Sequence, residues 1–170
     1  AYLPTIRITG YNGQFFPDFY IPAWLEGFMV EGISTAEDPQ YPCGIRGAFQ
    51  DNKMIQTVYL GNNLRYIEGW EAFKDCSNLH TIHFGKNMLD IEIRMFEGCT
   101  SLRNVNIPAP IKTIGWGAFS GCTNLLTVTF PDTLETIESG AFSECESLTS
   151  IVIPDRVKVV NGFSNCTRLR

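Results

Sequence analysis

A segment with phenylalanine, cysteine and leucine at fixed spacing recurs along most of the chain, and it constrains the fold more than any other feature. Its most regular copy is Ala-Phe-Ser-Gly-Cys-Thr-Asn-Leu at 118–125. The same residues recur in three more full copies, with cysteines 23 residues apart: Phe73/Cys76/Leu79, Phe96/Cys99/Leu102 and Phe142/Cys145/Leu148. A weaker copy has Phe49, Asn52 and Ile55, and a shortened last copy has Phe163, Cys166 and Leu169. Self-similarity at such a period is typical of solenoids, in which each repeat packs on its neighbours.

An alternating apolar run follows each copy. The runs have the pattern Leu-x-x-Val-x-Ile: Ile55/Val58/Leu60, Leu79/Ile82/Phe84, Leu102/Val105/Ile107, Leu125/Val128/Phe130 and Leu148/Ile151/Ile153. Period-two alternation predicts a short strand with one buried face, and a glycine or proline ends each strand. A second apolar pair marks the return path: Leu64/Ile67, Leu89/Ile91, Ile111/Ile114, Leu134/Ile137 and Val157/Val160. Similar strands joined by such returns stack in parallel, about 4.7 to 4.9 Å apart.

The combination of Ala-Phe-x-x-Cys-x-x-Leu, Leu-x-x-Val-x-Ile-Pro and Ile-Gly-x-x-Ala-Phe resembles the BspA-type leucine-rich repeats of bacterial and protozoan surface proteins. Residues 111–130 match this pattern best. The predicted fold class is an α/β repeat: a right-handed leucine-rich-repeat solenoid of about six coils, with 21–24 residues per repeat over residues 44–170. A concave parallel β-sheet and short helical or irregular convex returns are expected. The resemblance implies a cell-surface or secreted protein that adheres to host or matrix proteins.

The two ends of the chain depart from the repeat. Residues 1–43 are rich in aromatic residues and are predicted to form an irregular N-terminal cap, with a first strand at 3–8; an inserted binding loop is the alternative. The chain stops at Leu169-Arg170, where another strand should begin, so the C-terminus is expected to be truncated.

The recurring cysteine is predicted to form a buried structural ladder. Phenylalanine, cysteine and leucine at i, i+3 and i+6 fall near one face of a turn, and free cysteine packs as a small apolar residue. The ladder consists of Asn52, Cys76, Cys99, Cys122, Cys145 and Cys166. Disulfides between rungs are an alternative, although parallel Cβ vectors disfavour them. Unpaired thiols favour a reducing or anaerobic environment. Cys43 lies outside the ladder, and its redox state stays open.

Composition and motifs limit the classes of function. A net charge of -5 and a pI near 5.0 give no attraction to nucleic acid. No apolar run approaches the length of a membrane-spanning helix, and no basic segment precedes the most apolar N-terminal stretch, so neither membrane insertion nor a signal peptide is predicted. His80 and His83 should face opposite sides of a strand. No catalytic, cofactor or metal motif is recognised, because there is no Cys-x-x-Cys pair, phosphate loop or nucleophile elbow. The chain is therefore predicted not to be an enzyme and to need no cofactor.

Two outward columns of the predicted sheet are candidates for binding. One column is small and polar throughout, as suits close strand packing: Thr57, Thr81, Asn104, Thr127 and Ser150. The other changes chemistry from coil to coil and is the predicted ligand-binding column: Tyr59, His83, Asn106, Thr129 and Val152. Arg7 would extend it from an earlier strand. We expect a non-enzymatic adhesion module that recognises a protein, or a glycan, through this column; the alternative is an intracellular scaffold without a dedicated ligand. The sequence does not indicate the oligomeric state.

Overall fold

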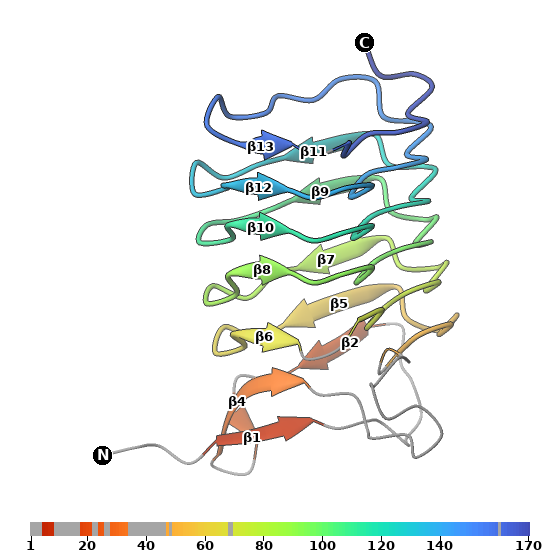
Figure 1. Cartoon of the computed structure of the whole chain (residues 1–170). Helices are drawn as coiled ribbons and strands as arrows, with labels where there is room; N and C mark the ends of the chain where they lie inside the picture. Colours follow the sequence, from red (N-terminus) through yellow and green to blue (C-terminus); the bar gives the residue numbers. More distant parts are fainter. Residues whose placement is uncertain are drawn as a thin grey trace.

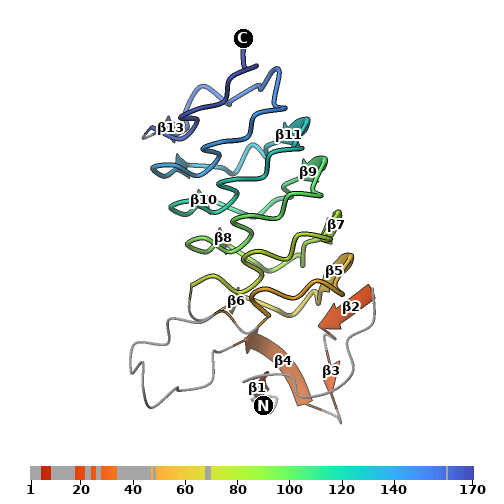
Figure 2. The same cartoon turned by 90° about the vertical axis from the view of Figure 1, so that its right-hand side faces the viewer.

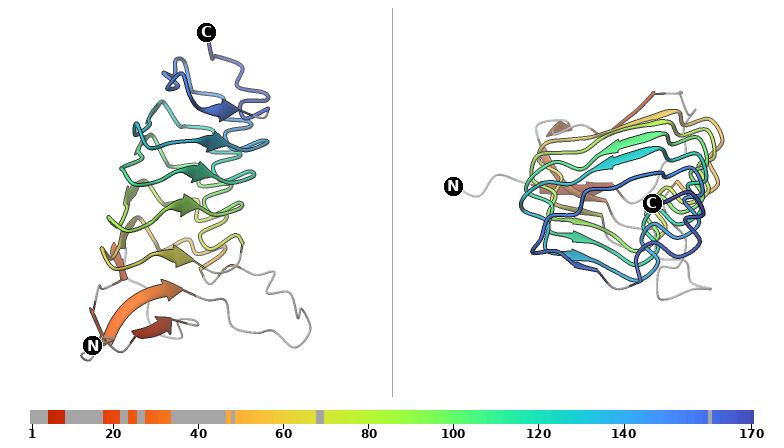
Figure 3. Two further views of the ribbon diagram at one scale, coloured as in Figure 1. Left: turned by 60° about the vertical axis from the view of Figure 1, so that its left-hand side comes forward. Right: turned by 90° about the horizontal axis from the view of Figure 1, so that it is seen from above.

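The chain coils into a solenoid in which parallel strands stack along two sides (Figure 1). The structure, a computed structural model, describes residues 5–8, 18–21, 24–25, 28–33, 47, 49–67, 70–159 and 161–170. Viewed from the C-terminal end (Figure 3), one set of strands crosses one side of the coil and the other set returns across the opposite side as the chain rises. Seen from this end, the chain turns anticlockwise as it rises toward the viewer, which makes the solenoid right-handed.

The first sheet is formed by the alternating runs that follow each Phe-Cys-Leu segment. Its strands are β2 (Asp18–Ile21), β5 (Thr57–Leu60), β7 (Thr81–His83), β9 (Asn104–Asn106) and β11 (Thr127–Thr129). β2, β5 and β7 pair in parallel, as do β9 and β11, and β7 lies next to β9. The predicted parallel sheet is therefore present. The last run, at 148–153, was also predicted to be a strand but carries none.

A second parallel sheet lies on the return path. It comprises β4 (Phe28–Ile33), β6 (Tyr66–Ile67), β8 (Asp90–Ile91), β10 (Thr113–Ile114), β12 (Thr136–Ile137) and β13 (Lys158–Val159). β4 pairs with β6, and β8, β10, β12 and β13 pair in that order. Helical or irregular returns were predicted here. Strands of two residues are too short for alternation to reveal them.

The turn face connects the second sheet to the first and carries the Phe-Cys-Leu segments (Figure 2). A helix was one expectation for this path, but none occurs in the parts of the chain that the structure describes. On each coil from Glu71 onward two residues have positive φ, for example Gly117 (62°) and Gly121 (70°). A right-handed helix cannot continue through this left-handed backbone conformation. Instead, neighbouring coils are joined by backbone hydrogen bonds such as Phe96 N to Ala118 O at 2.8 Å.

The core is a column of stacked rings beside a column of thiols. Phe119 lies 5.4 Å from Phe96 and 5.2 Å from Phe142 between ring centroids, and is fully buried. The ring stack consists of Phe49, Phe73, Phe96, Phe119, Phe142 and Phe163. One predicted core residue is wrong: Leu89 is 43% exposed, and Met88 is buried in its place. Met88 and Ile91 have the i, i+3 spacing of Leu64/Ile67, which places both side chains inward.

The N-terminal strands continue both sheets. β2 joins β5 in the first sheet, and β4 joins β6 in the second. β1 (Thr5–Ile8) pairs in parallel with β4, and β3 (Trp24–Leu25) pairs with it antiparallel. Arg7 therefore lies on a strand of the second-sheet stack and does not extend the Tyr59 column, because its strand pairs with β4. Cys43 lies outside the described residues.

Candidate binding surface on the first sheet

The parallel register of the first sheet places the predicted ligand-binding residues in one outward row. Tyr59 is paired with His83, and Asn106 with Thr129. Tyr20 on β2 is paired with Tyr59 and adds a member at the N-terminal end. Tyr20 was not among the predicted binding residues, because residues 18–21 carry no copy of the repeat. The sequence feature that could have revealed Tyr20 is the pair of apolar residues on either side of it. Phe19 and Ile21 pair with Val58 and Leu60, which face inward.

Three rings of this row form a continuous stack, which we call the aromatic column: Tyr20, Tyr59 and His83. The centroids of Tyr20 and Tyr59 are 4.1 Å apart with the rings 2° from parallel. Those of Tyr59 and His83 are 4.4 Å apart at 8°. Because the rings cover one another's faces, they present their edges outward. His83 is exposed and Tyr20 is 62% exposed. The free face of the His83 ring is the one that looks along the sheet toward β9.

Four polar side chains follow the aromatic column, and we call them the polar grid: Asn104, Asn106, Thr127 and Thr129. The Thr127 hydroxyl donates to Asn104 Oδ1 at 2.7 Å, and the Thr129 hydroxyl donates to Asn106 Oδ1 at 2.5 Å. Each amide oxygen is held by a threonine, so the Nδ2 groups are left to donate. A hollow of about 730 Å³ extends from His83 over the grid and is bordered by Pro108. Aromatic edges and amide donors thus meet at one surface.

Val152, the last predicted member of the row, is 86% exposed. It lies in the run at 148–153, which carries no strand, so no strand pairing holds it in register with Thr129. The structure brings Tyr59, His83, Asn106 and Thr129 together and leaves Val152 at the edge of the group.

The ladder cysteines point into the core and are free thiols. Each donates to the carbonyl oxygen of the phenylalanine on the preceding coil, as Cys122 does to Phe96 O at 3.3 Å. The ladder bonds span Cys76, Cys99, Cys122, Cys145 and Cys166 at 3.0 to 3.3 Å. Burial raises the pKa of the Cys76 thiol to about 12 and raises that of Cys122 well above its usual value. Such thiols stay protonated and are poor nucleophiles.

Asn52 occupies the ladder position on the first coil, where a side-chain amide bonds to the backbone in place of a thiol. Its Oδ1 accepts from Met54 N at 2.8 Å and Ile55 N at 3.2 Å. This side chain therefore closes the turn that enters β5, as asparagine commonly does.

The described residues contain no group of three or more His, Cys, Asp or Glu side chains that could hold a metal ion. His80 bonds through Nδ1 to the Thr81 hydroxyl at 2.9 Å, beside the entry to β7, whereas His83 ends that strand. Within the described ranges, no helix has the length and apolar character needed to cross a bilayer.

Comparison with known families identifies the repeat. The model of BspA-type leucine-rich repeat regions matches residues 46–170 in six copies. No curated protein matches the chain.

Solved structures resemble the fold over nearly the whole chain. A leucine-rich repeat protein from Bacteroides ovatus is 26% identical, with a TM-score of 0.68, and the match covers 97% of this chain and 48% of that one. A leucine-rich cell surface protein from Faecalibacterium prausnitzii is 28% identical, with a TM-score of 0.66 and coverage of 98% and 49%. The pneumococcal vaccine antigen PcpA, at 24% identity, TM-score 0.69 and coverage of 94% and 41%, shows the fold alone. The chain thus spans about half the length of the first two proteins.

Proposed function

Because the chain belongs to the family of BspA-type leucine-rich repeat proteins, we propose that it is a non-enzymatic binding and adhesion module of a cell-surface or secreted protein. Repeats of this kind are typically structural and binding units. Its partner is a protein, bound across the aromatic column and the polar grid on the first sheet. The solenoid has about six coils, one for each family-model copy, and residues 1–43 cap its first end.

The observation that carries this proposal is the aromatic column beside the polar grid. Tyrosine edges combine apolar area with a hydroxyl and lose little side-chain entropy on binding, which suits them to protein interfaces. The Nδ2 donors of Asn104 and Asn106 can bond to carbonyls of a partner. The arrangement of apolar contact beside satisfied polar groups is that of an interface core and its rim.

Stacked rings also favour a protein over a glycan at this surface. A sugar ring packs on an aromatic face, and both faces of Tyr59 are covered by Tyr20 and His83. Among the described rings, only the outer faces of Tyr20 and His83, at the two ends of the stack, lack a ring neighbour and could take such contact. A protein can use the exposed ring edges and the adjacent hollow together.

The test is binding of the full chain to a panel of purified extracellular-matrix proteins, measured by surface plasmon resonance. We expect the double variant Tyr59→Ala/His83→Ala to weaken binding about tenfold or more. The variant should stay folded with a modestly lower melting temperature, because it removes the stacking of Tyr59 on Tyr20 and His83 but no core side chain. Leu89→Ala is the matched control, since Leu89 is 43% exposed near β8, on the other side of the coil. Equal affinity for the double variant and the native chain would exclude this surface.

An intracellular scaffold without a dedicated ligand is the alternative, and the free, buried thiols favour it. Fractionation of the source cells separates the two. Protease-accessible protein on intact cells supports the surface module, and protein confined to the cytosol supports the scaffold.

A further inference from the structure

The turn face carries two outward columns whose chemistry changes abruptly between the early and late coils. At the first position the residues are Glu71, Arg94, Gly117, Gly140 and Asn161, and three residues later they are Lys74, Glu97, Ser120, Ser143 and Ser164. The early coils therefore carry four long charged side chains, and the late coils carry short ones. Because the backbone has the same path on each coil, the shorter side chains of the late coils leave the surface lower there than on the early coils.

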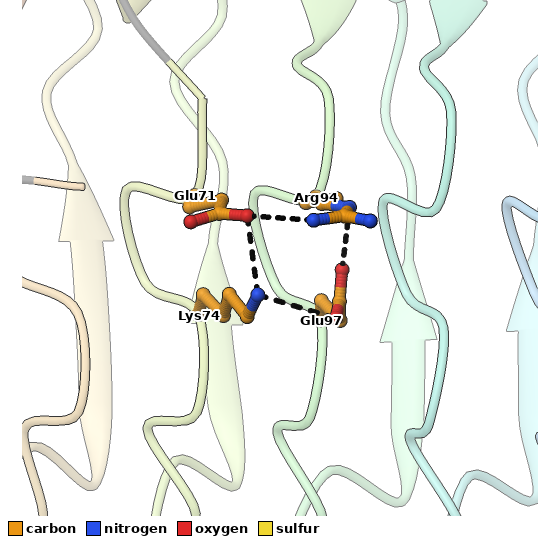
Figure 4. Close-up of polar contacts among 4 residues, drawn as sticks. All are labelled: Glu71, Lys74, Arg94 and Glu97. Carbon is orange, nitrogen blue, oxygen red and sulfur yellow. Dashed lines mark hydrogen bonds and ion pairs between the residues drawn. The ribbon is translucent and has the colours of Figure 1, made fainter. Parts of the chain in front are cut away.

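The charged side chains form a closed ion network (Figure 4). Glu71 Oε1 lies 3.0 Å from Arg94 Nη1 and 3.1 Å from Lys74 Nζ. Glu97 lies 3.0 Å from Arg94 Nε through Oε2 and 3.4 Å from Lys74 Nζ through Oε1. Every member touches two others, so these side chains fill the early part of the turn face and are unavailable to a ligand.

A hollow of about 300 Å³ begins where the network ends. Arg94, Glu97 and Trp116 border it, and its floor includes Gly117 and Gly140, which have no side chains. This volume lies at the lower end of the range of about 300 to 1,000 Å³ for small-ligand sites, in which a few polar groups fix the orientation of the ligand.

Trp116 is the aromatic wall of this hollow. The Arg94 guanidinium carbon lies 4.3 Å from the centroid of the Trp116 ring and covers one face. A methyl group placed on Gly140 would come within 3.9 Å of the indole nitrogen, so the absence of a side chain there leaves the indole edge accessible. Trp116 is 44% exposed, and its backbone N–H donates to Glu138 Oε2 at 2.9 Å, which anchors the residue.

The remaining lining supplies hydrogen-bonding groups that the protein does not use. The hydroxyls of Ser120, Ser143 and Ser164 and the indole N–H of Trp116 have no side-chain hydrogen-bond partner among the described residues. These hydroxyls can donate and accept, and the indole N–H can donate. An exposed aromatic surface with donors and acceptors arranged beside it complements a pyranose ring, which has apolar C–H faces and a rim of hydroxyls.

The local charges select among saccharides. Arg94 and Glu97 are the charged residues that border the hollow, and Arg94 is already paired with the carboxylates of Glu97 and Glu71. An anionic sugar would therefore find no unpaired cation among the lining residues, whereas a neutral sugar can bond to the lining hydroxyls and the indole N–H. We propose that this turn-face hollow binds a neutral saccharide, with one pyranose ring stacked on Trp116 and its hydroxyls bonded to Ser120, Ser143 and Ser164. The site is separate from the first sheet and does not depend on the function proposed there.

The experiment is calorimetric titration of the full chain with four neutral tetrasaccharides, cellotetraose, maltotetraose, mannotetraose and chitotetraose, and with sialyllactose as an anionic probe. We expect at least one neutral tetrasaccharide to bind with a Kd of about 0.1 to 1 mM, as suits a shallow site that holds one or two rings. Sialyllactose should bind more weakly. Failure of every neutral probe to bind at about ten times that concentration would overturn the proposal.

Two variants test the location of the site. Trp116→Ala removes the stacking wall, and Ser143→Lys fills the hollow with the residue that occupies the same position at Lys74; each should weaken saccharide binding about tenfold or more. Trp70→Ala is the matched control, because Trp70 occupies the position of Trp116 two coils earlier, is 51% exposed and does not border the hollow. It should bind normally, as should Tyr59→Ala/His83→Ala. If Trp70→Ala weakens binding as much as Trp116→Ala, or if neither hollow variant weakens it, the assignment is wrong.

Discussion

Replacement of Phe119 by alanine tests whether the ring stack holds the solenoid together. Phe119 is fully buried and stacked on both sides, by Phe96 at 5.4 Å and Phe142 at 5.2 Å. Its backbone N–H donates to Ala141 O at 2.7 Å, and this bond needs no side chain. The variant therefore removes ring packing and leaves the backbone connection between coils in place.

The expected loss of unfolding free energy is about 4 kcal/mol, in the upper half of the range of roughly 3 to 5 kcal/mol for a buried phenylalanine. Two aromatic contacts, each about 0.5 to 1.5 kcal/mol beyond area burial, favour the upper half of that range. Backbone bonds on both sides oppose collapse of the cavity, so relaxation recovers little. Phe163→Ala is the matched comparison, since Phe163 is half-buried and has one described ring neighbour, Phe142 at 5.3 Å. Its expected loss is about 1 to 2 kcal/mol.

Urea unfolding followed by circular dichroism measures both losses from the midpoint and slope of each transition. In a repeat protein each coil is stabilised mainly by its neighbours, so an internal rung should matter more than a terminal one. Equal losses for the two variants, or a loss below about 1 kcal/mol for Phe119→Ala, would refute the reasoning that paired stacking sets the stability of the column.

Two further predictions concern the thiols and the ion network. The buried ladder thiols should resist alkylation in the native chain and react after denaturation: Cys76, Cys99, Cys122 and Cys145. Because burial raises their pKa values, the folded thiols stay protonated where the unfolded ones ionise, so the free energy of unfolding should fall as pH rises through about 9. Rapid labelling of Cys122 in the native chain, mapped by mass spectrometry, would contradict the burial of the ladder. Glu71→Gln should lower the free energy of unfolding in urea by about 1 to 2 kcal/mol, because Glu71 pairs with two cations and is largely buried. Glu135→Gln, in the exposed Lys112–Glu135 pair, should lower it by less than about 0.5 kcal/mol. Equal losses for the two variants would show that burial of the network contributes nothing to stability.

The sequence predicted the interior of the solenoid well because the interior is where the repeat is strict. Phenylalanine and cysteine at fixed spacing mark positions that contact the same residue on the next coil, as Phe96 contacts Phe119. The first sheet followed from the alternating runs. The row that joins Tyr59 to His83 followed from their equal positions in the repeat, and the stacking of the rings depends on that register.

Features that do not repeat, or that are shorter than the pattern, could not be predicted in this way. The second sheet has strands of two residues, as at Thr113–Ile114, which show no alternation. Leu89 was predicted to be buried, whereas the structure buries Met88, which has the i, i+3 spacing to the buried Ile91. Tyr20 joins the aromatic column by strand pairing across a long sequence separation, and no local motif encodes that contact.

Two different requirements could account for the glycines of the turn-face hollow: space for a ligand, or a backbone conformation that favours glycine. The first turn-face column has positive φ on every coil, from 46° at Asn161 to 67° at Gly140, and a residue with a side chain pays roughly 1 to 2 kcal/mol for that conformation. Backbone geometry alone therefore favours glycine at 117 and 140. Glu71 and Arg94 adopt the same conformation at 66° and 52°, and their mutual ion pair offsets the strain. Backbone geometry thus accounts for the glycine floor of the hollow without a ligand. Trp116 and the unpartnered serine hydroxyls, which the backbone does not require, are the features that indicate a saccharide.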